Sequence, residues 1–431
     1  MQYYSTNQQA PKADLKEAVV RGLAPDKGLH MPEQLPVFSS AFFEQLHNLS
    51  LQEIGAEVAK CFFGDSVDNK ALKQIAEETL NFEIPLVKLS EQIFSLELFH
   101  GPTCAFKDVG GRFMARMLAY FTQNEQQDIY VLTATSGDTG SAVASGFFNV
   151  PGIKVIILYP KGKVSHIQEQ QLTTHGHNIT ALEVDGTFDD CQKLVKEAFN
   201  TEGLRKKLKL TSANSINLAR FLPQAIYYYH AVAQLGKTDK KIVFSVPSGN
   251  FGNLTAGIFA WNSGLPVHKF IAATNVNDIV PQYLETGIFS PKHSIKTLAN
   301  AMDVGNPSNF VRMLEIFEHQ HDKMAEMVKG FSLDDEGIQK YMQLIYEKHQ
   351  YIADPHGAIG YAALDQQLQE NEVGIFLETA HPAKFIDITE KVLQREVPIP
   401  ERLGAYLKKK KEAVPLKADF NAFQDYLYSI S

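Results

Sequence analysis

Apolar and polar residues are arranged in two different ways along the chain. Up to about Phe94, apolar residues recur at helical spacing, as in SLQEIGAEVAKCFF, and no series of strands is evident. From Leu96 onward, short apolar runs alternate with helical segments, first SLELF, IYVLTA, KVIILYP and ITALEV and later KIVFSV, KFIAAT and GIFLETA. This alternation is typical of βα units around a parallel sheet. The pattern therefore predicts an α/β protein with two parallel-sheet lobes and a mostly helical N-terminal region.

The changes of pattern also suggest domain boundaries. We expect residues 1–94 to form the N-terminal region, residues 95–127 and 207–431 a large α/β domain, and residues 128–206 a small α/β domain. Ligands of parallel α/β sheets bind at the carboxyl ends of the strands. The loops that follow the strands are therefore expected to carry the chemistry.

Composition and charge narrow the class of protein. A chain of 431 residues that is 44% hydrophobic and 21% charged fits a globular protein with a sizeable core. Its 41 Lys and Arg residues against 49 Asp and Glu residues give a formal net charge of −8. Because there is no overall basic field, neither nucleic acid nor an anionic membrane is expected as a partner, and any anionic ligand must be held by local groups.

The cysteines and the N-terminal residues bear on location. Cys61, Cys104 and Cys191 are widely spaced and odd in number, which indicates a reducing compartment and fits neither a disulfide framework nor a zinc motif. The first residues lack the pattern of a signal peptide, and no apolar run is long enough to span a bilayer. We therefore expect a cytoplasmic protein.

Two glycine-containing loops follow predicted strands and precede predicted helices. In PSGNFGN, at positions 247–253, small residues let successive backbone N–H groups converge on a phosphate, although an ordinary turn explains the pattern equally well. In TSGDTGSA, at positions 135–142, hydroxyl groups at a helix start suit a carboxylate or a phosphate. The carboxylate of Asp138 would repel such an anion, so this residue either meets a hydroxyl or a positive group or simply caps the helix.

Further polar residues stand at other strand ends. Lys163 follows KVIILY, and SANSINLAR contains Ser215, Asn217 and Arg220. An arginine fork with amides and hydroxyls nearby could bind a phosphate, although this stretch taken alone fits a capped helix with an exposed arginine better. Thr379 follows the last strand and offers a neutral hydroxyl. The HGH motif lacks the partners of a metal site, and no metal is predicted.

The stretch HGPTCAFKDVGGRF holds a single lysine, Lys107, at the start of an apolar helix. In water a lysine amine has a pKa of about 10.4, but burial or a neighbouring cation shifts it toward the nucleophilic form. Such a lysine, a glycine loop that cradles an anion and a hydroxyl at a strand end suit an aldehyde cofactor that carries a phosphate. Pyridoxal phosphate has these properties, and Lys107 would bind it as a Schiff base.

Several of these stretches occur together in one known family. In this order, HGPTCAFKDVGGRFMARML, ATSGDTGSA, LYPKGKVS, SANSIN, VPSGNFGNLTAG, NAMDVGNPSN and ETAHPAKF resemble the threonine synthase family, which comprises pyridoxal-phosphate enzymes of the tryptophan-synthase-β type, or fold type II. The resemblance begins at GLAPDKGLHMPEQLP and extends past His381, so it covers nearly the whole chain. It implies that the large domain binds the cofactor. Cys104 departs mildly from the pattern and is expected to pack rather than to react.

The resemblance also implies roles for individual residues. Lys107 would bind the cofactor's aldehyde, Thr379 would face its pyridine nitrogen, and Asp138 would lie beside its 3′-oxygen. The cofactor's phosphate would bind to the loop of Gly249, Asn250, Phe251, Gly252 and Asn253. The implied reaction converts O-phospho-L-homoserine and water into L-threonine and phosphate, the last step of threonine synthesis. The residues expected to bind this substrate are Thr103, Ser136, Lys163, Ser215, Asn217 and Arg220.

Two other functions stay open at this point. A dehydratase or another β-eliminating enzyme of the same fold would share Lys107 and the glycine loop, but it would release a keto acid without depending on a substrate phosphate. A catalytically silent relative that binds metabolites would be favoured if Lys107 or the loop were lost, and both are present. We expect a monomer or a homodimer whose partner is the small-molecule substrate.

Overall fold

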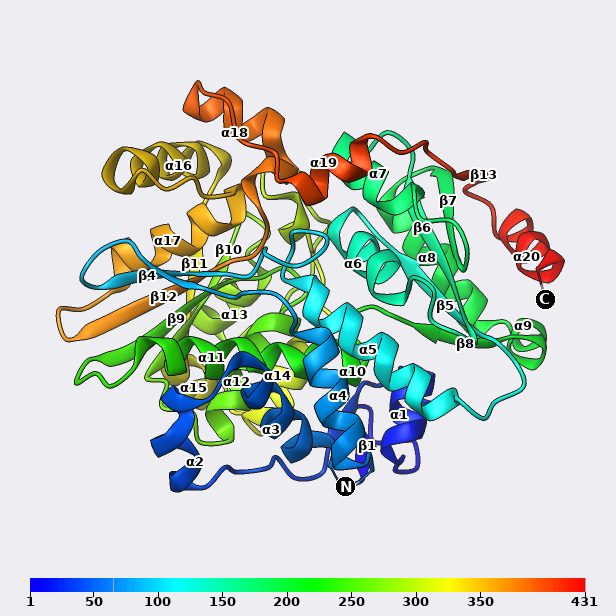
Figure 1. Ribbon diagram of the computed structural model, residues 1–431, viewed down its shortest axis with the longest axis horizontal. Coiled ribbons are helices and arrows are strands. Elements are labelled where there is room, and N and C mark those ends of the chain that lie inside the picture. The colour runs from blue at the N-terminus through cyan, green and yellow to red at the C-terminus, as the bar shows by residue number, and fades with distance from the viewer. Residues whose placement is uncertain (65, 431) are drawn as a thin grey trace. The chain divides into compact units, whose positions relative to one another are not determined.

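The structure is a computed structural model that describes residues 1–64 and 66–430. The chain divides into two compact units, each with its own sheet of mostly parallel strands (Figure 1). The first unit comprises residues 31–106 and 221–398 together with Met1, and the second comprises residues 2–30, 107–220 and the C-terminal part from Ile399. Two α/β units built on parallel strands confirm the predicted fold class.

A six-stranded sheet forms the centre of the first unit. In spatial order its strands are β11 (Val328–Ser332), β10 (Lys269–Thr274), β9 (Lys241–Pro247), β12 (Glu372–Glu378), β4 (Ile93–Glu97) and β3 (Leu86–Lys88). All neighbours are parallel except β3, which pairs antiparallel with β4 at the edge. Every residue of β12 is buried, as expected for a parallel strand that is covered on both faces.

Helices cover this sheet. α17 (Pro355–Gln367) packs on β12 and β9, and α16 (Asp335–His349) and α18 (Ile386–Leu393) lie beyond it (Figure 1). Ile359 of α17 and Phe376 of β12 belong to the same apolar core. The remaining helices of this unit are α2 (Ser40–Gln45), α3 (Leu51–Phe63), α4 (Asn69–Thr79), α11 (Ala225–Leu235), α12 (Gly252–Asn262), α13 (Ile279–Thr286), α14 (Phe310–Ile316) and α15 (His321–Met327), with the 3-10 turns η1 (Leu46–Asn48), η2 (Leu222–Gln224), η3 (Asn300–Met302) and η4 (Pro382–Phe385).

The second unit contains a five-stranded sheet in which every pair is parallel. Its order is β13 (Val414–Lys417), β7 (Ile179–Asp185), β6 (Ile153–Pro160), β5 (Ile129–Ala134) and β8 (Lys209–Ser212). Cys191 is fully buried and belongs to the same apolar core as Leu132 and Leu182. The other elements are α1 (Leu15–Arg21), α5 (Lys107–Thr122), α6 (Asp138–Phe147), α7 (His166–Thr173), α8 (Phe188–Asn200), α9 (Glu202–Lys207), α10 (Leu218–Phe221), α19 (Glu401–Leu407), α20 (Phe420–Ser429) and the short strand β1 (Tyr3–Ser5). The short strand β2 (His30–Pro32) begins at the last residue of segment 2–30 and continues into residues of the first unit.

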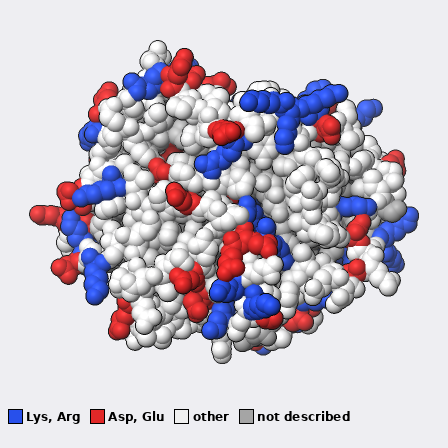
Figure 2. Space-filling view, viewed as in Figure 1, with Lys and Arg blue, Asp and Glu red and all other residues white. Residues whose placement is uncertain are grey.

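Two features concern the whole set of described residues. None of their helices combines the length and the apolar character needed to cross a membrane. On the face seen in Figure 2, positively and negatively charged side chains are interspersed. This mixture agrees with the moderate formal net charge of −8.

Candidate active site

The loop of residues 249–253 connects β9 to α12 in the first unit. Asn253 closes the turn, because its Nδ2 donates to the Pro247 carbonyl (2.8 Å) and its Oδ1 accepts from the Ser248 hydroxyl (2.9 Å). Phe251 takes up a left-handed backbone conformation with a φ of 60°. Within the described residues, the backbone N–H groups of residues 249–253 donate to no protein acceptor. N–H groups of this kind at the start of a helix can hold a phosphate.

A second segment supports this loop. Asn309 donates both its backbone N–H and its Nδ2 to the Asn250 carbonyl, each at 3.1 Å. The buried Arg312 in turn donates to Asn309 Oδ1 (2.6 Å). A Cβ atom at Gly249 would come within 2.7 Å of the Ala301 carbonyl oxygen, so only glycine fits there without a shift. These contacts fix the loop in a conformation that fits a phosphate group.

Thr379 and Thr103 also belong to the first unit. Thr379 follows the last residue of β12, and its carbonyl accepts from the Phe106 N–H (2.8 Å). Its side chain is almost buried, and its hydroxyl makes no hydrogen bond to another residue in the described part of the chain. Thr103 is fully buried, and its carbonyl accepts from Lys384 Nζ (2.9 Å). The Thr379 hydroxyl can therefore form a hydrogen bond with a ligand.

Sequence reasoning missed a buried network next to Thr379. Asp354 caps α17 and accepts from the N–H groups of His356 and Ala380. Glu378 accepts from the Asp354 N–H (2.7 Å). Burial, and after it the negative charge of Asp354, raises the pKa of Glu378 well above its usual value. The available signal was two acidic residues in apolar surroundings, in ADPHGAIG and GIFLE.

Lys107 is the first residue of α5, in the second unit. Its carbonyl accepts from Arg220 Nη1 (2.6 Å), and Arg220 Nε donates to the Ala213 carbonyl (3.1 Å). A Cβ atom at Gly110 would lie 2.6 Å from Arg220 Nη1, so glycine lets the guanidinium approach the helix. Arg220 is only 3% exposed, and the alternative of an exposed arginine is therefore wrong. Its guanidinium holds the backbone at the position of Lys107.

The other candidate residues of this unit differ in their surroundings. Asn217 is fully buried, with its Nδ2 donating to the Val19 carbonyl (2.8 Å) and its Oδ1 accepting from the Ala219 N–H (3.0 Å). Ser215 is half-buried, and Lys163 is exposed in the turn after β6. Asn217 thus stabilises the fold through hydrogen bonds to the backbone, whereas the Lys163 side chain is exposed to solvent.

Asp138 is the first residue of α6, after a turn that begins at the end of β5. Gly137 occupies the cap position with a φ of 143°, so the alternative in which Asp138 caps the helix is wrong. Asp138 Oδ1 instead accepts from Gln168 Nε2 (2.9 Å). The Thr135 hydroxyl accepts from the Gly137 N–H (3.0 Å), and Ser136 is half-buried in the same turn. The Asp138 carboxylate is thus oriented by an amide.

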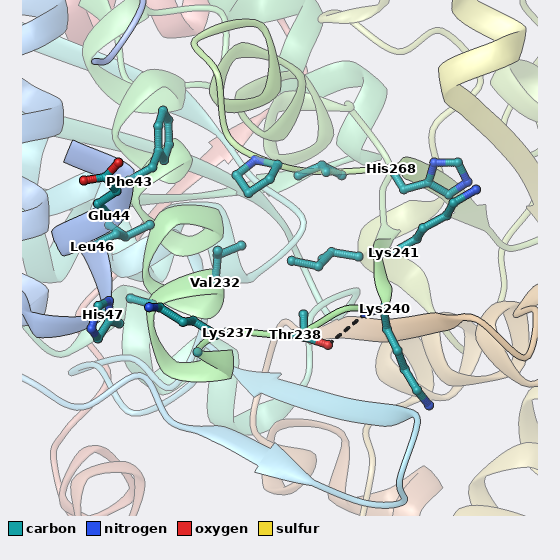
Figure 3. Close-up of a pocket in the computed structure, with 15 residues that line it drawn as sticks. Phe43, Glu44, Leu46, His47, Val232, Lys237, Thr238, Lys240, Lys241 and His268 are labelled. Carbon is teal, nitrogen blue, oxygen red and sulfur yellow. Dashed lines mark hydrogen bonds between the residues drawn. The ribbon is translucent and has the colours of Figure 1, made fainter. Parts of the chain in front are cut away.

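A separate pocket of about 510 Å³ lies elsewhere in the first unit (Figure 3). Phe43 and Val232 contribute to its apolar wall, and Lys237, Lys240 and His268 stand around it. None of the residues predicted to bind cofactor or substrate lines this pocket. It is therefore not part of the candidate active site.

Comparison with known families identifies the class of protein. Residues 49–377 match the family described as "Pyridoxal-phosphate dependent enzyme". A lysine at the start of a helix can bind the aldehyde of this cofactor, and loop N–H groups that donate to no protein acceptor in the described residues can bind its phosphate. The protein is a pyridoxal-phosphate-dependent enzyme. Residues 2–80 match "Threonine synthase N terminus", and residues 357–427 match "Threonine synthase, C-terminal".

Individual relatives extend the match to the full length. The threonine synthase of Escherichia coli (strain K12) is 43% identical over 426 residues, which are 98% of this chain and 98% of that protein. The crystal structure of threonine synthase from Escherichia coli aligns with 100% of this chain over 100% of its own length, with a TM-score of 0.94 and 42% identity. That of a PLP-bound threonine synthase from Brucella melitensis also has a TM-score of 0.94, with 32% identity over 100% of this chain and 99% of that one. The chain belongs to the threonine synthase family.

Proposed function

We infer that the protein converts O-phospho-L-homoserine and water into L-threonine and phosphate, the last step of threonine synthesis. The observation that carries this inference is 43% identity to a threonine synthase over 98% of both chains. Bound pyridoxal phosphate supplies the electron sink that stabilises negative charge next to the substrate's amino group. The residues of this chain bind that cofactor, orient the substrate and move protons.

Lys107, residues 249–253, Thr379 and Asp138 are proposed to bind the cofactor. Lys107 binds its aldehyde carbon, and the N–H groups of residues 249–253 donate to its phosphate. The Thr379 hydroxyl faces its ring nitrogen, and Asp138 lies beside its 3′-oxygen. A neutral hydroxyl at the ring nitrogen leaves that nitrogen without a proton, in contrast to a carboxylate. This arrangement moderates electron withdrawal and disfavours transamination.

Lys107 is proposed to move the protons of the reaction. With substrate and cofactor bound, the Lys107 amine would remove a proton from the substrate's Cα and then one from Cβ, and the phosphate would leave from Cγ. Cγ is protonated, water adds at Cβ, and Cα regains a proton. The hydrogen bond from Arg220 to the Lys107 carbonyl supports this role, because it fixes the backbone from which the amine extends.

Polar residues of the second unit and Thr103 are proposed to bind the substrate. Lys163 is the first choice for its phosphate, because its ammonium is exposed. Arg220 and Asn217 already donate to backbone carbonyls, and we propose that they shape the site. The residues proposed to form the substrate site, by contact or by shaping it, are Thr103, Ser136, Lys163, Ser215, Asn217 and Arg220.

We also propose that the protein works in the cytoplasm as a monomer or a homodimer, without a nucleic-acid or membrane partner. The formal net charge of −8 supports the absence of a nucleic-acid partner, because polyanions would be repelled. The three scattered cysteines support a reducing compartment.

An assay of both products tests the proposed function. Purified holoenzyme given O-phospho-L-homoserine should release threonine and phosphate in equal amounts. Lys107→Ala should lower turnover by at least about a hundredfold, the size of a lost proton-transfer group, and should leave no adduct that borohydride can trap. The exposed Lys73 provides a matched control, and Lys73→Ala should behave like the native protein. A keto acid formed without phosphate release would instead identify a β-eliminating enzyme.

A further inference from the structure

Asp354 is a buried carboxylate that accepts an unusual number of hydrogen bonds. Its Oδ1 accepts from the N–H groups of His356 and Gly357 at the start of α17. The same oxygen accepts from His356 Nδ1 (2.9 Å). The proton of that ring lies on Nδ1, because Nε2 accepts from the Ala301 N–H (3.3 Å). Asp354 Oδ2 accepts from the Ala380 N–H (3.1 Å). Both side-chain oxygens of Asp354 are thus occupied by hydrogen-bond donors.

The bond to Ala380 connects this carboxylate to Thr379. The Ala380 N–H belongs to the peptide group that follows Thr379, and Asp354 fixes it at 3.1 Å. The carbonyl of that same peptide group accepts from the Phe106 N–H at 2.8 Å. Both polar groups of one peptide bond are therefore anchored, and the backbone of Thr379 has little freedom to rotate. This anchoring restricts the direction of the Cα–Cβ bond from which the Thr379 hydroxyl extends.

Glu378 lies against another acidic residue, Asp354. Its Oε1 accepts from the Asp354 N–H (2.7 Å), and its Oε2 is buried with no hydrogen-bond partner in the described structure. A Cβ atom at Gly357 would come within 1.7 Å of this Oε2, so glycine makes room for the carboxyl group. The neighbouring acids are Asp354 and Glu97, and Glu97 is itself bonded to Tyr351 (2.9 Å) and His100 (2.6 Å). Two adjacent buried carboxylates repel each other strongly, and the weakly bonded one takes the proton.

We propose that Asp354 is a positioning residue for the cofactor: its Oδ2 anchors the Ala380 N–H and thereby aims the Thr379 hydroxyl, while Glu378 beside it carries a proton. The proposal rests on the role of Thr379 at the ring nitrogen in the proposed function. A helix cap alone would not need such burial. Asp334 caps α16 through the Gly337 N–H (2.8 Å) from an exposed position, where ionised carboxylates cost little.

Asp354→Asn tests the proposal, with Asp334→Asn as the matched control. Both variants replace one carboxylate oxygen of a helix cap by an NH₂ group. In Asp354→Asn the NH₂ group accepts no hydrogen bond, and the remaining amide oxygen cannot accept from both the Ala380 N–H and the His356 donors. Thr379 should therefore turn away from the ring nitrogen. We expect at least a tenfold weaker retention of pyridoxal phosphate, and an absorption band of the bound cofactor that changes position between pH 6 and 9. Asp334→Asn should show neither change.

The thermal unfolding of the cofactor-free variants separates positioning from simple stability. Asp354→Asn could lower the thermal unfolding midpoint as Asp334→Asn does and still keep the native cofactor affinity and absorption spectrum. In that case Asp354 is only a helix cap, and the proposal is overturned. Glu378→Gln mimics a protonated carboxyl group and should keep the native spectrum. If Glu378→Gln instead alters the spectrum as Asp354→Asn does, Glu378 is ionised in the native protein. The proposal that Glu378 carries a proton is then overturned. These readouts need no substrate, so their failure is distinct from a failure of the threonine-forming assay.

Discussion

At the scale of single residues, Arg220 joins two stretches of backbone. Its guanidinium donates to the carbonyls of Lys107 and Ala213. Arg220→Lys keeps the positive charge, but an ammonium cannot reproduce the planar fork that reaches both acceptors. A buried carbonyl left without its donor costs about 1 to 3 kcal/mol. We expect the free energy of unfolding, measured in urea, to fall by about 2 kcal/mol, and turnover to fall with it.

Arg205→Lys provides the control for this substitution. Arg205 is exposed in α9, so its replacement should change neither stability nor turnover measurably. Unchanged stability of Arg220→Lys together with a raised KM for O-phospho-L-homoserine would contradict a backbone role. That result would indicate that Arg220 contacts the substrate directly.

Asp303 is a partly buried carboxyl group whose protonation affects stability. It accepts hydrogen bonds from Thr297 and Asn275, yet burial raises its pKa to about 6 from the usual 3.8. The native state therefore binds the proton more tightly than the unfolded state. This contribution to stability is fully present below pH 3.8 and is lost as the pH rises through about 6.

Asp303→Asn removes this titration. Between pH 4 and 7, the free energy of unfolding should decline less with rising pH in the variant than in the native protein. Urea unfolding of both proteins across this range provides the comparison. Parallel curves for the two proteins would show that Asp303 does not titrate with a raised pKa.

At the scale of elements, the turn between β9 and α12 depends on a close approach of two backbones. A Cβ atom at Gly249 would lie 2.7 Å from the Ala301 carbonyl oxygen, so Gly249→Ala should displace the loop and weaken the retention of pyridoxal phosphate about tenfold or more. Equilibrium dialysis of the cofactor measures this effect. In α19, a Cβ atom at Gly404 would meet no atom within 4 Å, and Gly404→Ala should leave cofactor binding unchanged. Equal retention in both variants would argue against the loop as the phosphate site.

Elements also show which parts of the site the sequence could predict. The strand KIVFSV and the loop PSGNFGN are contiguous, and local spacing was enough to predict β9, the turn and the helix after it. The bond between Asp354 and Glu378 joins residues 24 positions apart, and that between Arg220 and Lys107 spans 113 positions. Such pairs form only when separate elements pack, and no local pattern marks them. The buried state of Arg220 was missed for this reason.

At the scale of the whole molecule, the family matches cover residues of both units. Residues 49–377 match the pyridoxal-phosphate-dependent enzyme family, and residues 2–80 and 357–427 match the N-terminal and C-terminal families of threonine synthase. A chain with the full set of parts is expected to carry out the full reaction. That reaction breaks the bond between Cγ and the ester oxygen, and it adds a water oxygen at Cβ.

The fate of the water oxygen tests this chemistry most directly. Holoenzyme is incubated with O-phospho-L-homoserine in water enriched in oxygen-18, and both products are analysed by mass spectrometry. The label should appear in the β-hydroxyl of threonine and be absent from the phosphate, because the ester oxygen leaves with phosphorus when the carbon–oxygen bond breaks. Labelled phosphate with homoserine as the other product would mean that water attacks phosphorus, and it would contradict the threonine synthase reaction.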